Sequence, residues 1–207
     1  GPSSLSPYLS FPLDTADKIS IISPLSLNLQ VIKRTDPRIL ANMAVHYSQP
    51  KGFVGRNICY AVLHAGLYYG SIVGGSATLH LPGRDEYFGL GTSLSLNNLV
   101  NNIFFHVEKV GGRYPMRWFT VEVLQAFRQR IVVDWQARYG DVVAGFESLV
   151  ELPRTGECYK HDGWDLIGQT IGYTCKRVAG KGTDNWSGKR VWDMKNLRPK
   201  LVFAKKA

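Results

Sequence analysis

The sequence is poor in cysteine and contains no long apolar run. Its three cysteines, Cys59, Cys158 and Cys175, form neither an even set nor a CxxC pair. This spacing favours neither a disulfide framework nor a structural zinc site, and it is typical of a reducing cytoplasm. No stretch approaches the roughly 20 apolar residues of a membrane span, and the start lacks the basic region of a signal peptide. We therefore expect a cytoplasmic protein without a membrane partner.

Acidic residues are also scarce relative to basic ones. The chain has 16 Asp and Glu against 25 Lys and Arg, for a formal net charge of +9. Such a balance favours an anionic partner, with nucleic acid as the first candidate. Ten of the basic residues but only two acidic ones lie between residue 176 and the end. Residues 176–207 are therefore predicted to contact phosphates.

The length and composition predict one domain. The chain of 207 residues is 44% hydrophobic, which suffices for a single core. Residues 1–26 are rich in Ser, Pro and Leu without periodicity, and we interpret them as an N-terminal extension whose first two residues are a protease remnant. Residues 27–207 are expected to form the domain, with a basic C-terminal segment at 176–207.

Hydrophobic periodicity predicts alternating strands and helices. Strands are expected at 27–33, 57–63, 67–73, 103–110, 142–150 and 165–174, and helices from Pro37 to near Tyr47, at 115–139 and at 156–163. Residues 76–102 are predicted to be a long polar connection. The order indicates an α/β class with a mixed central sheet flanked by helices.

This order resembles the GNAT acyltransferase fold, in which the fourth strand opens beside the fifth to form a cleft. The segment 158–164 (CYKHDGW) resembles that family's aromatic-rich segment on its fourth helix. The resemblance implies that Tyr159 is a general acid toward the leaving group. The family's Q/R-x-x-G-x-G/A loop for the coenzyme A pyrophosphate is absent, and the stretch 110–117 keeps only two glycines and two arginines.

Several short motifs resemble one branch of this fold more closely. They are His46-Tyr47-Ser48, Val54-Gly55-Arg56, the run 134–140 (DWQARYG), Phe146-Glu147-Ser148 and the run 155–170. Over residues 28–200 the chain is similar to the Mom DNA-modification proteins of Mu-like phages and to a Druantia anti-phage component, and residues 33–91 resemble Mom more. The resemblance implies an enzyme that converts adenine N6 in duplex DNA to the N6-carbamoylmethyl form and so protects phage DNA from host restriction.

An exocyclic adenine amine is a poor nucleophile, so such a reaction needs a base near it and an acid or oxyanion site near the carbonyl. Tyr159 is the candidate acid, with a packed tyrosine as the alternative. Glu147 can face a cleft from its strand, or form a surface ion pair. His46 and Tyr47, at the end of the first helix, can contact or deprotonate the adenine, although a histidine there also suits a helix C-terminus. Asp134 is a second-ranked catalytic candidate, because it can instead hold the long helix in place.

A bound metal ion is an open alternative in this interpretation. The five histidines show no HxH or HExxH spacing. If a metal is bound, His46, Tyr47 and Asp134 are the candidate ligands. Cys158 is a weaker candidate nucleophile, since a cysteine beside the helix tyrosine more often packs.

Modification of a base within a duplex requires its extrusion, which stacking and phosphate contacts offset. Tyr47, Tyr114 and Trp164 are candidate stacking residues. The other candidate DNA-binding residues are Arg56, Arg84, Arg113, Arg117, Lys160, Lys189 and Arg190.

The donor follows from the product that the resemblance implies. A carbamoylmethyl group has the same atoms as a glycyl group, so glycyl transfer followed by rearrangement would produce it. Because the pyrophosphate loop is absent and the surface is basic, we favour glycyl-tRNA over acetyl-CoA, which makes tRNA a second partner. Two other functions stay open: a non-catalytic DNA-binding component of a defence system, and a small-molecule N-acetyltransferase.

Overall fold

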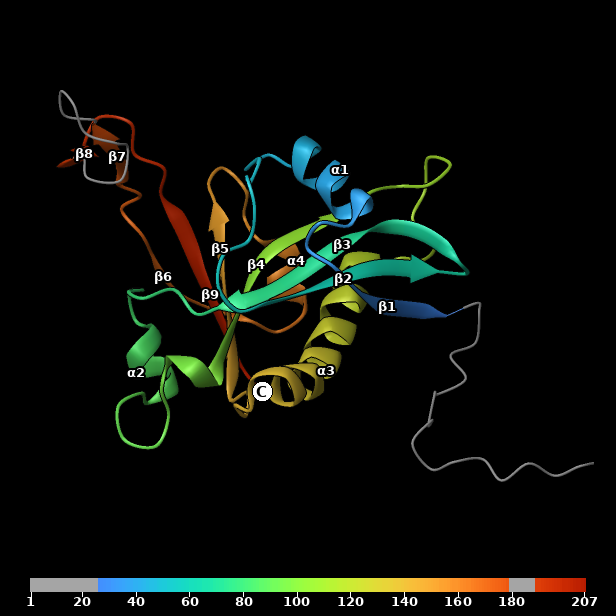
Figure 1. Cartoon of the computed structure of the whole chain (residues 1–207), viewed down its shortest axis with the longest axis horizontal. Coiled ribbons are helices and arrows are strands. Elements are labelled where there is room, and N and C mark those ends of the chain that lie inside the picture. Colours follow the sequence, from blue (N-terminus) through green and yellow to red (C-terminus); the bar gives the residue numbers. More distant parts are fainter. Residues whose placement is uncertain (1–25, 179–188) are drawn as a thin grey trace, which may run out of the picture.

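A computed structural model describes residues 26–178 and 189–207 of the chain, with side chains for 26–175 and 191–207. The expected N-terminal extension therefore lies almost entirely outside the described residues. The elements, in chain order (Figure 1), are β1 (Leu27–Ile32), α1 (Pro37–Val45), β2 (Asn57–His64), β3 (Leu67–Ser76), α2 (Arg84–Phe88), the 3₁₀ turn η1 (Leu96–Asn98), β4 (Leu99–Val107), α3 (Phe119–Tyr139), β5 (Gly145–Glu151), α4 (Glu157–His161), β6 (Asp165–Gln169), β7 (Thr174–Val178), β8 (Lys189–Asp193) and β9 (Lys200–Lys206).

In this described part, seven strands form a mixed sheet in the order β1-β2-β3-β4-β5-β9-β6, and β7 pairs with β8 in a separate hairpin. All neighbours in the large sheet are antiparallel except β4 and β5, which run parallel. The expected α/β class, with a mixed central sheet flanked by helices, is confirmed.

Side chains alternate between the two faces of the sheet along each strand, and this divides the core into a cluster on each face. Ile58 and Tyr60 of β2 join the cluster under α3, whereas Cys59 between them joins the cluster under α1. Successive strand residues point to opposite faces, so one strand supplies both layers. α1 and α3 accordingly lie on opposite sides of the sheet (Figure 1). Close approach of α3 explains Gly74, since a Cβ there would lie 2.1 Å from Ile131 Cδ1.

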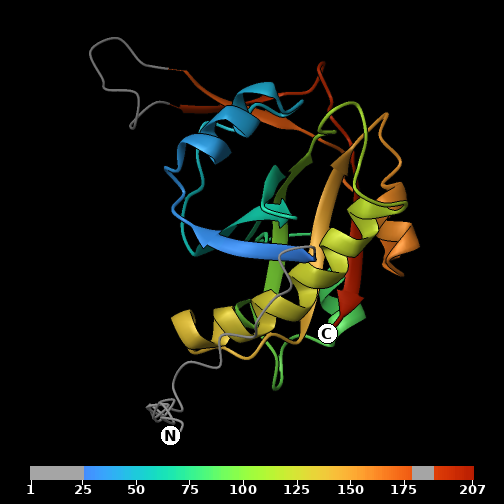
Figure 2. The same cartoon turned by 90° about the vertical axis from the view of Figure 1, so that its right-hand side faces the viewer.

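Two expected elements differ in the structure, and one strand was not expected. The predicted connection at 76–102 contains α2, η1 and the first residues of β4. The long helix begins at Phe119 instead of Pro115, because Gly111 and Gly112 make a turn at positive φ and Trp118 adopts a left-handed conformation with φ 61°. The basic C-terminal segment includes β9, whose Val202, Phe203 and Ala204 are buried between β5 and β6. Figure 2 shows β9 beside β5, with α3 crossing the sheet.

No helix in the described ranges is long and apolar enough to cross a membrane.

Candidate functional site

The two parallel strands at the centre of the sheet separate soon after they meet. The β4–β5 ladder contains only three pairs and ends at Asn101↔Glu147. Beyond this point lies a cavity of about 670 Å³. Its walls are the later residues of β4 and β5, residues 46–48 after α1, and the start of α4. The opening between the fourth and fifth strands, which the sequence resemblance implied, is therefore present in the structure.

Tyr159 of α4 lies in the wall of this cleft. Its hydroxyl donates a hydrogen bond of 2.5 Å to Asn102 Oδ1, and its ring packs on Phe203 and Trp164. Burial raises the pKa of the Tyr159 hydroxyl, because the phenolate would lose its hydration. The group is therefore neutral at physiological pH, with its proton directed to Asn102 Oδ1.

Asn102 organises the separation of the strands. Its Nδ2 donates to the carbonyls of Val73 and Phe104, each at 3.0 Å. The β3–β4 register shifts at this point, since Gly74 pairs with Asn102 and Val73 with Phe104, which leaves Ile103 as a β-bulge. The Ser148 hydroxyl of β5 donates 3.1 Å to the Asn102 carbonyl. Hydrogen bonds from side chains thus replace part of the backbone hydrogen bonding that is lost where β4 and β5 separate.

His46 lies on the α1 side of the cleft and is poorly suited to be a base. Its Nδ1 accepts from the Ser48 backbone N–H at 3.2 Å and lies 2.8 Å from Ser48 Oγ, while its ring contacts Phe104. Burial, followed by the nearby His106, lowers its pKa to about 4. The imidazole is therefore neutral, and the accepting nitrogen is already bonded.

Tyr47 lines the same cleft but is covered by an arginine that sequence reasoning missed. The Arg154 guanidinium carbon lies 3.3 Å from the centre of the Tyr47 ring, in a cation–π contact between residues that both line the cleft. Tyr47 is 40% exposed, and its pKa is raised by burial. The only sequence signal for Arg154 is its position next to the Thr155-Gly156 motif that leads into α4.

The structure contradicts the catalytic role expected of Glu147. Its side chain is fully buried, Oε2 accepts from Arg84 Nη1 at 2.6 Å, and Oε1 accepts from the Thr78 backbone N–H at 2.6 Å. Burial raises the pKa of Glu147, an effect that the bonds from Thr78 and Arg84 oppose. Since both oxygens are bonded and Glu147 does not line the cleft, Glu147 is a structural carboxylate.

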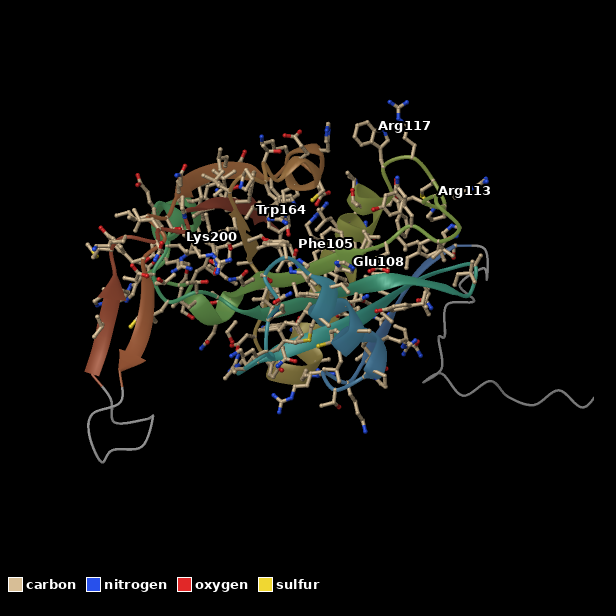
Figure 3. All side chains as sticks on the ribbon, turned by 90° about the horizontal axis from the view of Figure 1, so that it is seen from above. Phe105, Glu108, Arg113, Arg117, Trp164 and Lys200 are labelled. Carbon is tan, nitrogen blue, oxygen red and sulfur yellow. The ribbon has the colours of Figure 1, made fainter. Side chains whose placement is uncertain are left out.

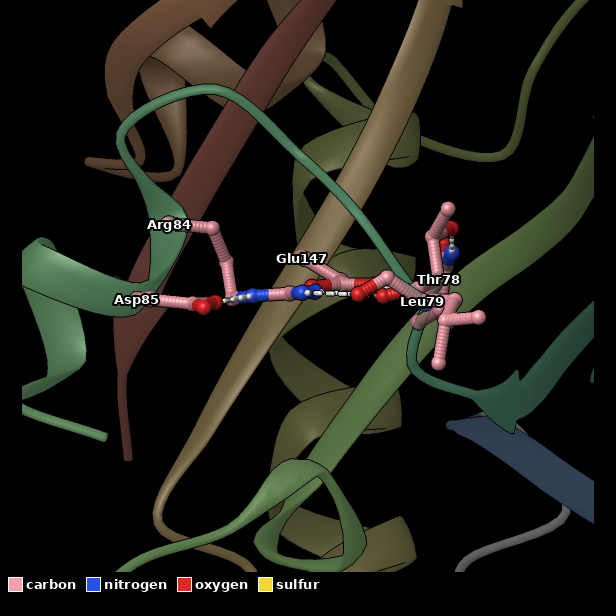
Figure 4. A network of polar contacts seen from close by, with 6 residues as sticks. Thr78, Leu79, Arg84, Asp85 and Glu147 are labelled. Carbon is pink, nitrogen blue, oxygen red and sulfur yellow. Dashed lines mark hydrogen bonds and ion pairs between the residues drawn. The ribbon is translucent and has the colours of Figure 1, made fainter. Parts of the chain in front are cut away.

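The expectation that Arg84 contacts a DNA phosphate is wrong for the same reason. Its exposure is 0%, and its guanidinium also donates to Asp85 and to the carbonyls of Thr78 and Leu79 (Figure 4). A buried, fully bonded guanidinium cannot reach a ligand at the surface. Its function here is to hold the segment after β3 against β5.

Asp134 lies apart from the other candidate metal ligands. It accepts from Tyr60 and from Arg130, both at 2.8 Å, on the α3 side of the sheet. His46 instead packs on Phe104, which belongs to the cluster on the α1 side. His46, Tyr47 and Asp134 therefore do not form one site. Among the residues that the structure describes, no group of three His, Cys, Asp or Glu side chains is arranged to hold a metal.

The expected DNA-binding residues occupy different environments. Arg113 and Arg117 are exposed and extend outward from the loop before α3 (Figure 3). Arg56 pairs with Asp141, and the exposed Lys160 pairs with Glu157. Lys189 and Arg190 begin β8, and their side chains lie outside the described part.

Trp164 is a further correction to this set. Its ring is buried, and its Nε1 donates 2.7 Å to Asp162. It cannot stack on an extruded base. Cys158 also differs from a nucleophile, because burial raises the pKa of its thiol to about 11.

No protein-family model and no curated protein sequence matches this chain. Several solved structures do match, at low identity. Arabidopsis thaliana NAA60 in complex with acetyl-CoA aligns with a TM-score of 0.46 and 10% identity over 88% of this chain and 100% of that one. The IAA acetyltransferase from Bacillus cereus gives a TM-score of 0.45, 11% identity and coverage of 88% and 100%. An acetyltransferase of the GNAT family from Streptococcus pneumoniae gives a TM-score of 0.45 and 10% identity, over 87% of this chain and 99% of that one. In this chain the parallel strands β4 and β5 separate after three pairs, as the resemblance stated from the sequence implied.

Proposed function

We propose that this chain is a GNAT-like transferase that moves an acyl-type group to an amine bound in the cleft between β4 and β5. The observation that carries the proposal is the Tyr159 hydroxyl, held in the cleft wall as a neutral donor by Asn102. The amine attacks the donor carbonyl and loses a proton to solvent, so that a C–N bond forms and the bond from the carbonyl carbon to the leaving group breaks. Tyr159 gives its proton to the departing sulfur or oxygen and recovers one from solvent.

The backbone of β4 would supply the second requirement of this chemistry. Past Asn101 its edge has no ladder partner in β5, and Ile103 is bulged. Backbone N–H groups along such an edge are suited to stabilise the oxyanion that develops on the carbonyl. Acetyl-CoA and glycyl-tRNA are the two donors to compare, and the exposed Arg113 and Arg117 beside the N-terminus of α3 suit the phosphates of either.

For the acceptor we propose the N6 amine of adenine in DNA. The support is the net charge of +9 together with the motif resemblance to the Mom proteins. The buried Arg84 and Trp164 no longer contribute to this proposal, whereas Arg113, Arg117 and Arg154 do.

The test is nucleoside mass spectrometry of DNA incubated with purified protein and either labelled acetyl-CoA or tRNA charged with labelled glycine. Labelled deoxyadenosine with wild-type protein and none with Tyr159→Phe is the expected result. Label only in small amines would favour the small-molecule N-acetyltransferase. Tight DNA binding with no product from either donor would favour the non-catalytic DNA-binding component.

A further inference from the structure

A second cavity adjoins the cleft. It has a volume of about 690 Å³, and four residues, Thr78, Leu149, Glu151 and Lys200, line both cavities. The two spaces are therefore neighbours across the same side chains of β5 and β9. Each is of a size that accommodates a small ligand, and a ligand with two linked parts can occupy both.

Two aromatic rings in the wall of the second cavity remain open to solvent. Tyr173 and Trp192 are 44% and 57% exposed, and they come from the segment after β6 and from β8. Neither ring stacks on another ring within the described side chains. Exposed tyrosine and tryptophan faces beside a cavity are the surfaces on which nucleobases stack.

The segment that carries Tyr173 is fixed in place. Thr170 N–H donates to the Lys200 carbonyl at 2.8 Å, and Arg198 N–H donates to the Gly172 carbonyl at 2.9 Å. Gly172 has φ 82°, and a Cβ there would lie 2.1 Å from the Arg198 carbonyl carbon. The close approach of the two backbones holds the wall of the cavity in position before any ligand arrives.

The charge at the junction of the cavities is positive. Arg198 is neutralised by Glu151 at 2.8 Å, but Lys200 has no ion pair with any described side chain. Lys200 lines both cavities. Its ammonium is therefore available to an anionic group that connects a ligand in the cleft to a ligand in the second cavity.

We propose that the second cavity is a nucleotide subsite that binds the base adjacent to the acceptor nucleotide, with Tyr173 and Trp192 stacking on that base and Lys200 contacting the phosphate between them. The proposal rests on the proposed function in taking a DNA strand as the acceptor. An acidic peptide would match the lysine but would leave the two flat aromatic faces without flat partners. A DNA strand matches both, because it carries flat bases and a phosphate between each pair of nucleotides.

The test is the affinity of an eight-nucleotide single-stranded oligodeoxynucleotide, measured by fluorescence anisotropy without any donor. Trp192→Ala and Tyr173→Ala should each weaken binding about tenfold, while Trp192→Phe should keep most of it. Lys200→Gln should lower the slope of log affinity against log salt by about one. Val191→Ala, in the neighbouring position of β8 and 46% exposed, is the matched control and should bind as wild type does. Thermal melting of each variant reports whether folding is retained.

Three results would overturn the subsite. They are wild-type affinity in folded Trp192→Ala, displacement of the oligonucleotide by polyglutamate as effective as by unlabelled DNA, and a strong preference for RNA of the same sequence. Failure of the proposed function has a different signature. DNA binding that depends on Trp192, without transfer to DNA, would contradict the proposed transfer and retain the subsite. Transfer to DNA, with binding that does not depend on Trp192, would contradict the subsite and retain the proposed transfer.

Discussion

Tyr159 and His46 both line the cleft, and burial shifts their pKa values in opposite directions. It raises the pKa of the phenol and lowers that of the imidazole to about 4. In each case the charged form is disfavoured, because an anion and a cation both lose hydration. At neutral pH the cleft therefore offers a neutral proton donor and a neutral imidazole. Deprotonation of the acceptor amine is left to solvent or to the substrate itself.

Replacement of Tyr159 by Phe should lower the rate of transfer about 100-fold or more, since the general acid is removed. The substitution also leaves Asn102 Oδ1 without its donor, which should cost about 1–3 kcal/mol of stability. Single-turnover rates and denaturant unfolding separate the two effects. Tyr60→Phe is the matched control, because it removes the hydrogen bond that another buried tyrosine donates to Asp134 outside the cleft. Equal loss of activity in both variants would show that destabilisation alone explains the Tyr159 result.

The low pKa of His46 predicts a pH-dependent stability. The unfolded imidazole binds a proton below its ordinary pKa of 6.5, whereas the folded one remains neutral until about 4. The folded state therefore loses stability as the pH falls through this window, by about 2–3 kcal/mol. The expected loss should disappear in His46→Gln. Denaturant unfolding of the wild type and of His46→Gln between pH 4 and pH 7 measures it. Parallel curves for wild type and His46→Gln would contradict the assignment.

Among the elements, those with strong periodicity were predictable and those defined by long-range partners were not. The apolar spacing within residues 115–139 predicted α3, and the two β-prone runs at 57–63 and 67–73 predicted the β2–β3 hairpin. The start of β4 was missed because Asn101 and Asn102 favour turns in isolation. In the structure Asn101 bonds Thr78, and Asn102 bonds two carbonyls at the bulge. β9 was missed because the basic residues around it dominated the interpretation of a short apolar run.

In the candidate site, too, features set by local sequence were predictable and features set by distant partners were not. Tyr159, His46 and Tyr47, which the family resemblance pointed to, all line one cleft. Glu147 and Arg84 were assigned to function because a sequence shows charge but not the partner that neutralises it. Their ion pair joins residues 63 positions apart. Arg154 was missed for the opposite reason, since only the fold brings it onto Tyr47.

The Arg84–Glu147 pair is the main polar connection between the segment after β3 and strand β5 (Figure 4). Glu147→Gln should therefore destabilise the fold by about 3–5 kcal/mol, because a buried guanidinium loses its counter-charge. Glu151→Gln, which weakens a pair with the exposed Arg198, should cost less than about 1 kcal/mol. Denaturant unfolding measures both. A double change to Glu147→Leu and Arg84→Met should recover part of the loss, and a mild effect of Glu147→Gln alone would show that the pair contributes little.

At the scale of the whole molecule, packing on the α3 face of the sheet holds α4 in position. The α3 face carries the largest core cluster, and Asp162 bonds Arg128 of α3 through both of its oxygens at 2.7 and 2.8 Å, which anchors the end of α4. This contact fixes the helix that carries Tyr159. β9 crosses the same region as an interior strand, so the segment beyond residue 176 is a structural part of the fold as well as a basic one.

The net charge of +9 predicts salt-sensitive binding to DNA, and the position of β9 decides how to test it. Deletion of the C-terminal segment would remove an interior strand and unfold the sheet, so point changes are required. Arg113→Gln with Arg117→Gln should weaken binding and lower the slope of log affinity against log salt by about two, since two phosphate contacts are lost. Arg130→Gln with Arg138→Gln, on the α3 side of the sheet, makes the same change in net charge and should leave the slope near wild type. Fluorescence anisotropy with duplex DNA between 50 and 300 mM salt, about the range in which such slopes are resolved, gives all three values. Equal slopes for the two double variants would show that total charge alone drives binding, and a salt-independent affinity of the wild type would contradict phosphate contacts altogether.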